Sequence, residues 1–495
     1  MTAIPFDNSY ARLPEQFHER IQPAPVRAPE LIRFNRPLAA RLGLDLPDDG
    51  PALARLFSGN EPIEGAQPLA QAYAGHQFGY FVPQLGDGRA ALLGEVVAPD
   101  GKRFDIQLKG SGRTRFSRGG DGRSPLGAVI REYVVSEAMH GLGVPSSRAL
   151  AMVATGETVR RERDLPGGVL TRVASSHIRV GTFEYFAARG DAASQRLLAD
   201  HVIDRHYPGC RAASDPYAEL FRRVILAVAD LTARWMGVGF IHGVMNTDNT
   251  SVARETLDFG PCAFLDGYDP SAVFSSIDGQ GRYAFDNQPA VAQWNLSSLG
   301  GCLAPLLAGG PDGDSNDTGE AGREAAEAIL AEFPDAFARR FQAVMARKIG
   351  IEDGDAADFA VVRELLRLMR GSGADFTVAF RELARWREGG VPFAALVGDG
   401  PAASGWIETW RARLAARNVS PERAAATMLA ANPARIPRNH QVERAIRAAE
   451  DAGDFAPANR LAEALADPYV DRPEFIEYEA PPEPHEMVRQ TFCGT

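Results

Sequence analysis

The sequence predicts an α+β protein of two lobes, a small β-rich N-terminal lobe with one key helix and a large, mainly helical C-terminal lobe. Three observations predict this architecture. The chain has 495 residues, more than one hydrophobic core usually covers. Strand-like stretches gather between residues 79 and 174 around a single helical stretch. From residue 182 onward, helical periodicity dominates.

The composition is that of a soluble globular protein, with 45% hydrophobic and 24% charged residues. No run of 18 or more apolar residues occurs, so we expect no membrane span and no membrane partner. The first residues lack the pattern of a secretory signal and that of a transit peptide, which predicts a cytoplasmic protein. A formal net charge of −11 argues against a nucleic-acid partner.

Residues 1–70 are expected to form an N-terminal extension packed on the lobes, with short helices near 28–42 and 51–57. The small lobe is predicted over residues 71–180. Its elements are five strands and one helix, with the strands at 79–85, 90–97, 104–108, 147–154 and 168–174 and the helix at 125–142. The first two strands are joined by Gly86-Asp87-Gly88-Arg89, whose composition is that of a hairpin turn.

The large lobe is predicted over residues 181–466. Its apolar residues recur at helical spacing in seven stretches, at 217–236, 286–307, 320–347, 355–389, 404–418, 420–431 and 440–466. Composition indicates a solvent loop at 309–319. Residues 467–495, rich in Pro and Glu, are expected to form a C-terminal tail.

The stretch from 240 to 266 carries the strongest functional signal. Its polar residues form two clusters, one of His242, Asn246, Asp248 and Asn249 and one of Asp258-Phe259-Gly260. Carboxylate and amide oxygens at two points suit Mg²⁺, which takes oxygen ligands and keeps phosphates and waters as the others. Strand-like residues at 251–252 and 263–265 are expected to form a hairpin that brings these groups together.

The spacing of these clusters resembles that of the protein-kinase catalytic loop, H-R-D-x-x-x-x-N followed by D-F-G. His242 and Asn249 stand in matching places, whereas Val244 occupies the place of the catalytic Asp. Asp248 lies late in the loop instead, which predicts a kinase-like metal site with a displaced base. We interpret His242 as a core histidine that braces the loop.

Cationic candidates lie in the small lobe. Lys109, one of only three lysines, ends an alternating strand and is either an exposed strand-end charge or a phosphate ligand. A phosphate-binding lysine needs an ion pair, for which Glu132 and Glu137 on the predicted helix are rivals that helical spacing does not separate. Arg172 and Arg179 flank the lobe junction and are either solvated surface or a pair that grips two phosphates.

Two glycine-rich loops, 86–89 and 119–122, lie at the same end of the predicted small lobe. Backbone amides in such loops bind phosphate, although each loop alone is typical of an ordinary turn. The four cysteines are too few and too scattered for a disulfide framework or a zinc site. Cys262 is interpreted as a small buried hydrophobe.

With these residues assembled, the chain resembles the selenoprotein O family of kinase-like proteins, once classed as pseudokinases. The matching stretches run in order over more than 200 residues. They are YAGHQFGYFVPQLGDGR (73–89), DIQLKGSGRTRFSRGGDGR (105–123), IREYVVSEAMHGLG (130–143), LTRVASSHIRVGTFE (170–184), HGVMNTDNTS (242–251), LDFGPCAFLD (257–266) and GRYAFDNQPAVAQWNL (281–296).

The resemblance implies a protein-kinase-like two-lobed fold that binds ATP in reverse. It implies transfer of AMP to the Ser, Thr or Tyr hydroxyls of proteins, with Mg-pyrophosphate leaving. The α-phosphorus of a reversed nucleotide is open to attack, and the charge that develops on the leaving group needs cations. By position, Lys109, Arg172 and Arg179 would hold the β- and γ-phosphates, and Glu132 would pair with Lys109.

The remaining roles are also implied by position. Asn249 and Asp258 would hold Mg²⁺, with Mn²⁺ as the alternative, and Asp248 would accept the proton of the incoming hydroxyl. The rest of the nucleotide would be lined by Gly86, Gly88, Arg89, Asp121 and Gly122. Members of the family often carry selenocysteine or cysteine third from the C-terminus, the place of Cys493, for which no disulfide partner is evident.

Two alternatives stay open at this point. The same pocket and metal would serve a conventional protein kinase that transfers the γ-phosphate of ATP. A non-catalytic nucleotide-binding pseudokinase that signals through a redox-sensitive tail is the second alternative. The presence of Asp248, Asn249 and Asp258 together argues against the second.

Overall fold

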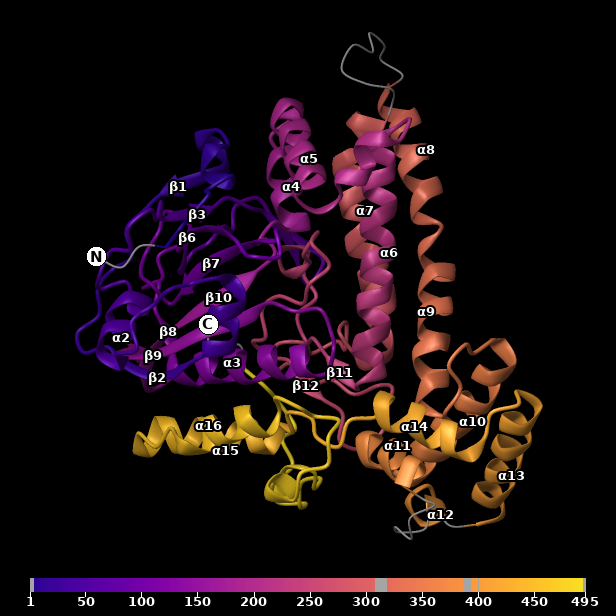
Figure 1. The fold of residues 1–495 in the computed structure, drawn as a ribbon. Helices are drawn as coiled ribbons and strands as arrows, with labels where there is room; N and C mark the ends of the chain where they lie inside the picture. Colours follow the sequence, from indigo (N-terminus) through magenta and orange to yellow (C-terminus); the bar gives the residue numbers. More distant parts are fainter. Residues whose placement is uncertain (1–3, 308–317, 386–392, 399, 493–495) are drawn as a thin grey trace.

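The computed structural model describes residues 4–307, 318–385, 393–398 and 400–492. It confirms an α+β protein with a small lobe built on a sheet and a larger helical part (Figure 1). Residues 309–317 of the expected solvent loop, and Cys493, lie outside the described residues. Within the described ranges, no helix combines the length and the apolar character that a bilayer crossing requires.

Among the described residues, the main sheet has eight strands and all its pairs are antiparallel. Its order is β1-β3-β6-β7-β10-β9-β2, and β8 also pairs with β10. The strands are β1 (His18–Arg20), β2 (Glu30–Phe34), β3 (Leu69–Gln71), β6 (Ala90–Val97), β7 (Arg103–Lys109), β8 (Ser124–Pro125), β9 (Arg148–Arg160) and β10 (Asp164–Ala174). The four strands predicted between residues 90 and 174 are thereby confirmed, with β9 and β10 longer than expected.

The prediction of a helix over 28–42 is wrong for the first half of that range. Glu30–Phe34 forms β2, which pairs with β9 at the edge of the sheet. The helix α1 begins only at Arg36, after the Asn35 side chain has accepted a hydrogen bond from Leu38 N. Pairing with a distant strand overrides the local helical pattern here. The second expected helix is confirmed as α2 (Gly50–Ser58).

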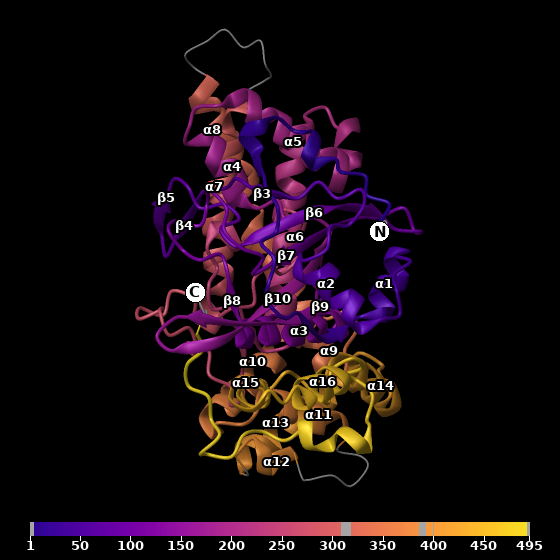
Figure 2. The same cartoon turned by 90° about the vertical axis from the view of Figure 1, so that its left-hand side faces the viewer.

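The strand expected over 79–85 is also only partly correct. Tyr80–Val82 (β5) pairs with Gly75–Gln77 (β4) as a separate hairpin, which Figure 2 shows beside the main sheet. Phe78 and Gly79 both have positive φ, as a two-residue hairpin turn requires. Residues 86–89 therefore connect this hairpin to the main sheet and are not a turn between two of its neighbouring strands.

Helices cover both faces of the main sheet. One face packs under α1 (Arg36–Leu42) and α2, where Leu53 and Phe57 meet Ile106 and Val169. The other face packs on α3 (Leu126–Gly141), which confirms the helix predicted at 125–142. On the outer side of α3 lie α15 (Asn439–Ala452) and α16 (Ala456–Ala464), a placement that the boundaries drawn from the sequence do not anticipate (Figure 1).

The larger lobe is built on long antiparallel helices around α6 (Pro216–Gly237), whose start is capped by the Asp215 side chain. Two apolar cores divide it, one around α5 to α8 and one around α9 to α14. Its helices are α4 (Val180–Ala187), α5 (Ala192–His206), α7 (Gln288–Leu307), α8 (Thr318–Leu330), α9 (Phe333–Lys348), α10 (Ala356–Ser372), α11 (Phe376–Arg385), α12 (Phe393–Leu396), α13 (Pro401–Ala416) and α14 (Pro421–Ala431).

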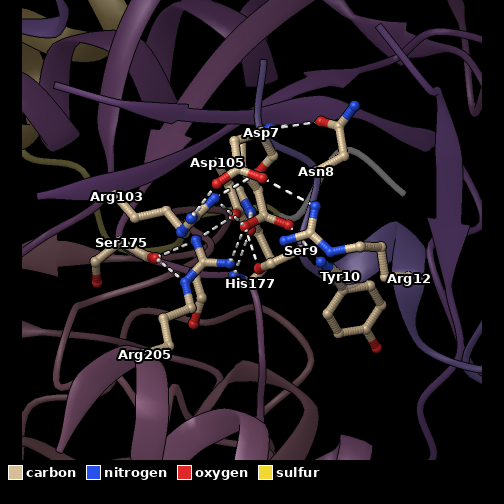
Figure 3. Close-up of polar contacts among 12 residues, drawn as sticks. Asp7, Asn8, Ser9, Tyr10, Arg12, Arg103, Asp105, Ser175, His177 and Arg205 are labelled. Carbon is tan, nitrogen blue, oxygen red and sulfur yellow. Dashed lines mark hydrogen bonds and ion pairs between the residues drawn. The ribbon is translucent and has the colours of Figure 1, made fainter. Parts of the chain in front are cut away.

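A network of charges, buried except at its outer end, joins the two lobes where β10 continues into α4 (Figure 3). Arg205, from α5, contacts Asp105 on β7, lies 3.0 Å from Glu95 on β6 and donates through Nε to Ser175 O at 2.9 Å. We call this the hinge cluster, consisting of Asp7, Arg12, Glu95, Arg103, Asp105, His177 and Arg205. It fixes the small-lobe strands to the first helices of the large lobe.

Candidate active site

A cavity of about 460 Å³ lies between the lobes. It collects residues from the two glycine-rich loops, the end of β7, α3, β10 and the stretch from 240 to 266. Every candidate residue singled out above for nucleotide, metal or proton transfer lines it, namely Gly86, Gly88, Arg89, Lys109, Asp121, Gly122, Glu132, Arg172, Arg179, Asp248, Asn249 and Asp258. Gly86 and Asp258, 172 positions apart in the sequence, thus line one site.

The choice between Glu132 and Glu137 is settled by geometry. Lys109 Nζ lies 2.6 Å from Glu132 Oε2 and 2.7 Å from Asp258 Oδ1. Glu137 turns to the other side of α3, where its carboxylate receives hydrogen bonds from Arg148 and Asn35. The rival interpretation of Lys109 as an exposed strand-end charge is wrong, because its side chain is only 14% exposed.

Two arginines complete a network around Asp258. Arg172 Nε donates to Glu132 Oε1 at 2.8 Å, and Arg172 Nη2 to Asp258 Oδ1 at 2.5 Å. Arg179 Nη1 donates to Asp258 Oδ2 at 3.1 Å and to the backbone oxygen of Asp248 at 2.6 Å. We call this network the cation cluster, consisting of Lys109, Glu132, Arg172, Arg179 and Asp258.

The cation cluster carries more positive than negative charge. Three cations face two carboxylates, which leaves a net charge of +1 beside the cavity. Burial opposes ionisation of Asp258, but Arg172, Lys109 and Arg179 hold its pKa well below the usual range. Asp258 also has φ of +64°, a strained backbone for a residue other than glycine and one that is common at functional sites.

The stretch from 240 to 266 folds differently from the expected hairpin. Ala263–Phe264 (β12) pairs with Phe240–Ile241 (β11), whereas Ser251 makes its isolated bridge with Arg179. His242 is buried and its Nε2 bonds to Leu257 O at 3.0 Å, which confirms its bracing role. Burial lowers the pKa of His242 and keeps it neutral.

Asp248 lies in a short 3-10 turn, Thr247–Asn249, and is 7% exposed. Its Oδ2 accepts a hydrogen bond from Gln77 Nε2 at 3.3 Å, while its Oδ1 has no partner among the described residues. Burial raises the pKa of Asp248 to about 6, so the carboxylate still ionises at neutral pH. A buried carboxylate oxygen without a partner is costly and suits a group that takes up a proton.

The donor set fits a magnesium ion. Asn249 Nδ2 donates to Val244 O at 3.0 Å, which turns its amide oxygen away from that carbonyl. Asp258 supplies carboxylate oxygens to the same cavity. Among the described residues, no group of three or more His, Cys, Asp or Glu side chains is arranged to hold a metal. An ion held by two protein side chains keeps phosphates and waters as its remaining ligands, as Mg²⁺ does.

The 86–89 loop packs against Phe116, which precedes the 119–122 loop, at the rim of the cavity. A Cβ atom on Gly86, whose φ is +76°, would lie 2.3 Å from the Phe116 ring, and one on Gly88 would lie 2.8 Å from Phe116 O. Glycine is required here for the contact with Phe116, whatever the nucleotide demands. Asp121 forms an ion pair with Arg161 at 2.8 Å.

Sequence reasoning missed other residues of the site. Asp87 is buried, lines the cavity and accepts hydrogen bonds from Gln71 N and from Gln107 Nε2. Tyr73 places its ring 4.6 Å from the Arg179 guanidinium. The signal for Gln107 was present, since it stands two residues before Lys109 on β7 and so shares its face.

The two-lobed α+β fold and the paired Lys109 and Glu132 opposite the Asp-Phe-Gly aspartate define the class of kinase-like proteins. Comparison narrows the class: the chain belongs to the family described as protein adenylyltransferase SelO, whose model matches residues 1–466. It is 54% identical to the protein nucleotidyltransferase YdiU of Maridesulfovibrio salexigens, over 100% of this chain and 99% of that protein.

Two further relatives with the same name give the same result. The protein of Nitrobacter winogradskyi is 55% identical over 99% of this chain and 96% of its own length. The protein of Agrobacterium fabrum is 54% identical over 99% of both chains. Identity of this order over the full length extends the likeness beyond the motifs that line the cavity.

Proposed function

We propose that the protein is a protein adenylyltransferase that transfers AMP from ATP to Ser, Thr or Tyr hydroxyls of other proteins. Membership of the SelO family supports this activity. The observation that carries the chemistry is the excess of cations around Asp258. A protein kinase has a catalytic Asp in the loop before the Asp-Phe-Gly motif. The place of that Asp is taken by Val244, which lines the cavity.

Lys109, Arg172 and Arg179 are proposed to bind the β- and γ-phosphates of ATP. Their surplus positive charge matches a polyphosphate, and two guanidinium groups offer bidentate hydrogen bonds. The same cations would stabilise the negative charge that develops on the leaving pyrophosphate. Gly86, Gly88, Arg89, Asp121 and Gly122 would line the rest of the nucleotide at the cavity rim.

The transfer itself needs a base and an open α-phosphorus. The acceptor oxygen attacks the α-phosphorus, the bond from that phosphorus to the bridging oxygen breaks, and pyrophosphate leaves. Asp248 is placed to take the hydroxyl proton, since its Oδ1 has no partner among the described residues. Asn249 and Asp258 would hold Mg²⁺ or Mn²⁺, which would supply charge stabilisation to the phosphates.

We also propose that the reaction takes place in the cytoplasm, where ATP is abundant. The three cysteines described, Cys210, Cys262 and Cys302, are all buried and none is in a disulfide with another of them, as is usual in a reducing compartment. We also propose a redox role for Cys493. Neither a nucleic acid nor a membrane is proposed as a partner, because the chain carries a net charge of −11 and no apolar span.

Labelled ATP tests this function. Purified protein is incubated with Mg²⁺ and casein, an unfolded acceptor, and with ATP labelled at either the α- or the γ-phosphate. We expect label in protein from α-labelled ATP alone, and none after the metal is chelated. Label from γ-labelled ATP alone would identify a conventional kinase. Binding of ATP with no label from either source would identify a non-catalytic nucleotide-binding protein.

A further inference from the structure

The hairpin formed by β4 and β5 is attached to the rest of the fold in an unusual way. Its strands pair with each other and with no other strand among the described residues. An isolated two-stranded hairpin is only marginally stable in water, so something else must hold this one. Its partner is the loop that carries Asp248.

Two side chains of that loop bind the backbone of the hairpin. His76 N donates to Thr247 Oγ1 at 2.7 Å, and Phe78 N donates to Asn246 Oδ1 at 3.0 Å. Buried Glu184 ties the arrangement together, because its carboxylate contacts His76 Nδ1 at 2.6 Å and accepts from Thr247 Oγ1 at 2.5 Å. The hairpin and the loop therefore form one rigid unit.

The inner strand of the hairpin sets the position of Asp248. Gln77 donates to its Oδ2, and Gly75 packs directly on its other carboxylate oxygen. A Cβ atom on Gly75 would lie 2.8 Å from Asp248 Oδ1 and 2.9 Å from Asp248 Cβ. Gly75 does not have a positive φ, so alanine is compatible with the backbone and would act only through displacement of Asp248.

The outer strand of the hairpin presents a large apolar side chain to solvent on the face that also carries Gln77, which lines the cavity. This side chain is Tyr80, which stands directly opposite Gln77 and is 80% exposed, more than any other large apolar side chain described. Ile277 is also exposed, at 57%, and lines the same cavity as Gln77 and Phe78. Exposed apolar residues that gather around one site mark an interaction surface, whereas single scattered ones do not.

We propose that this hairpin is the acceptor-binding element of the enzyme, an inference that rests on the proposed transfer to protein hydroxyls. The occupant is an extended segment of the acceptor protein, which adds as a further strand along the free edge of β5. Apolar residues flanking the acceptor hydroxyl pack on Tyr80 and Ile277. Gly75 and Gln77 act as positioning residues that hold Asp248 toward that hydroxyl.

The binding half of the proposal is tested with the double variant Tyr80→Ser and Ile277→Ser, using casein as the acceptor. We expect KM for casein to rise about tenfold or more, with kcat at saturating casein and Kd for ATP unchanged within about twofold. Leu226→Ser is the control. Leu226 is also an exposed apolar residue, at 41%, but it lies on α6 and does not line the cavity. An equal KM in the double variant and the control would overturn the acceptor surface.

The positioning half is tested with Gly75→Ala. We expect kcat to fall about 10²-fold or more, because small misplacement of a reacting group is costly, while KM for casein and Kd for ATP stay unchanged. Gly279→Ala is the matched control: Gly279 also lacks a positive φ, and nothing lies within 4 Å of its added Cβ. Wild-type kcat in Gly75→Ala, or an equal loss in Gly279→Ala, would overturn the positioning role.

Failure of this inference is separable from failure of the proposed function. All rates are measured with α- and γ-labelled ATP in parallel. Transfer of the γ-phosphate would refute adenylyl transfer, but the effect of each variant on KM and kcat could still be measured with that label. If the wild-type protein transfers neither label, fluorescence anisotropy of labelled casein still measures binding. Weaker binding of casein to the Tyr80→Ser and Ile277→Ser variant than to the wild type supports the acceptor surface. Equal affinity of the two proteins for casein, or no binding of casein by the wild type, overturns it.

Discussion

The cation cluster and the hinge cluster are built from the same chemistry and occupy opposite ends of one strand. Asp105 near the start of β7 is held by Arg205 and His177, and Lys109 at its end joins Arg172 and Arg179 around Asp258. Both networks connect the lobes through buried arginine and carboxylate groups. They differ in charge balance and in access to solvent.

The hinge cluster is balanced, and it is closed to solvent except at Asp7 and Arg12, whose side chains are 48% and 62% exposed. Its three arginines, Arg12, Arg103 and Arg205, face three carboxylates, and its Asp105 is 1% exposed. Burial lowers the pKa of His177, so this residue adds no charge at neutral pH despite its contact with Asp105. Such a network has no vacancy for a ligand and serves to set the lobes relative to each other.

The cation cluster is unbalanced and open. Its net charge is +1, and Asp258 is 19% exposed at the wall of a cavity. A polyphosphate that binds the three cations would release Asp258 for a metal ion, so we expect nucleotide and metal to bind cooperatively. A surplus of charge beside a cavity therefore distinguishes the binding network of this protein from its structural one.

The largest effect is expected at the carboxylate of the open network. Asp258→Ala should abolish AMP transfer, because loss of a metal ligand removes several kcal/mol of transition-state stabilisation. The variant should remain folded, since the side chain lines a cavity and is not part of an apolar core. Incorporation of α-label and circular dichroism measure the two results. A folded Asp258→Ala protein with full activity would contradict the metal assignment.

Asp248→Asn distinguishes two roles of Asp248, that of a general base and that of a metal ligand. The amide can still coordinate a metal through its oxygen but cannot take a proton at neutral pH. AMP transfer should fall by about 10²–10⁴, the usual contribution of a general base, with Kd for ATP and Mg²⁺ within a few-fold of wild type. Transfer near the wild-type rate with weakened metal binding would instead make Asp248 a metal ligand.

In the hinge cluster, a substitution is expected to lower the stability of the fold. Arg205→Met leaves Glu95 and Asp105 buried without their shared cation, which should lower the free energy of unfolding by about 3–5 kcal/mol. Urea titration measures the loss. Arg211→Met, which breaks a more exposed pair with Asp200 just beyond the same helix, should cost no more than about 1 kcal/mol. Equal stability of the two variants would remove the distinction between the networks.

The open network should respond in the opposite way. Lys109→Met leaves two arginines on two carboxylates, a neutral set, so the free energy of unfolding should fall by less than the loss expected for Arg205→Met, which leaves an unpaired buried charge. Kd for ATP should rise about 10–100-fold, because one of three phosphate contacts is lost. Calorimetric titration with ATP and Mg²⁺ measures the affinity. A loss of stability as large as that of Arg205→Met would show that both networks are structural.

A buried cation without a carboxylate gives the smallest expected effect. Lys348 packs its Nζ 4.4 Å from the centre of the Phe380 ring, and among the described residues no carboxylate pairs with it. Burial lowers the pKa of Lys348 to about 7 from a usual 10.5. At pH 7 and below, folding therefore carries the cost of a buried charge, and the cost declines as the pH rises toward 10.5.

Lys348→Met should raise the free energy of unfolding at pH 7 by about 1–3 kcal/mol. This advantage should shrink between pH 7 and pH 10, because the unfolded wild-type chain keeps its proton there while the folded chain loses it. Arg347→Met, an exposed neighbour on α9, is the control. A constant advantage across this pH range would mean that Lys348 is not the titrating group.

The sequence predicts the open network better than the closed one. Lys109, Asn249 and Asp258 stand in local motifs whose spacing is visible in the chain, and the ends of β7 and α3 follow from periodicity. Glu132 could not be chosen over Glu137, because both lie on α3 and only the packing of that helix on the sheet decides which faces Lys109.

No comparable signal marks the hinge cluster. Its residues come from separate segments, with Glu95 and Arg205 110 positions apart, and only the tertiary fold brings them together. The same holds for β2, whose helical pattern yields to pairing with β9, and for Gly75, whose importance lies in its contact with a side chain 173 residues away. Contacts of this range follow from topology, which local patterns do not specify.

A crystal structure with Mg²⁺ and an ATP analogue blocked at the α–β bridge tests the central claim most directly. We predict that the β- and γ-phosphates lie against Lys109, Arg172 and Arg179, that Asp258 and Asn249 contact the metal, and that the α-phosphate faces Asp248. A complex in which the γ-phosphate points toward Asp248 and away from Lys109 would contradict the reversed orientation and, with it, the proposed transfer of AMP.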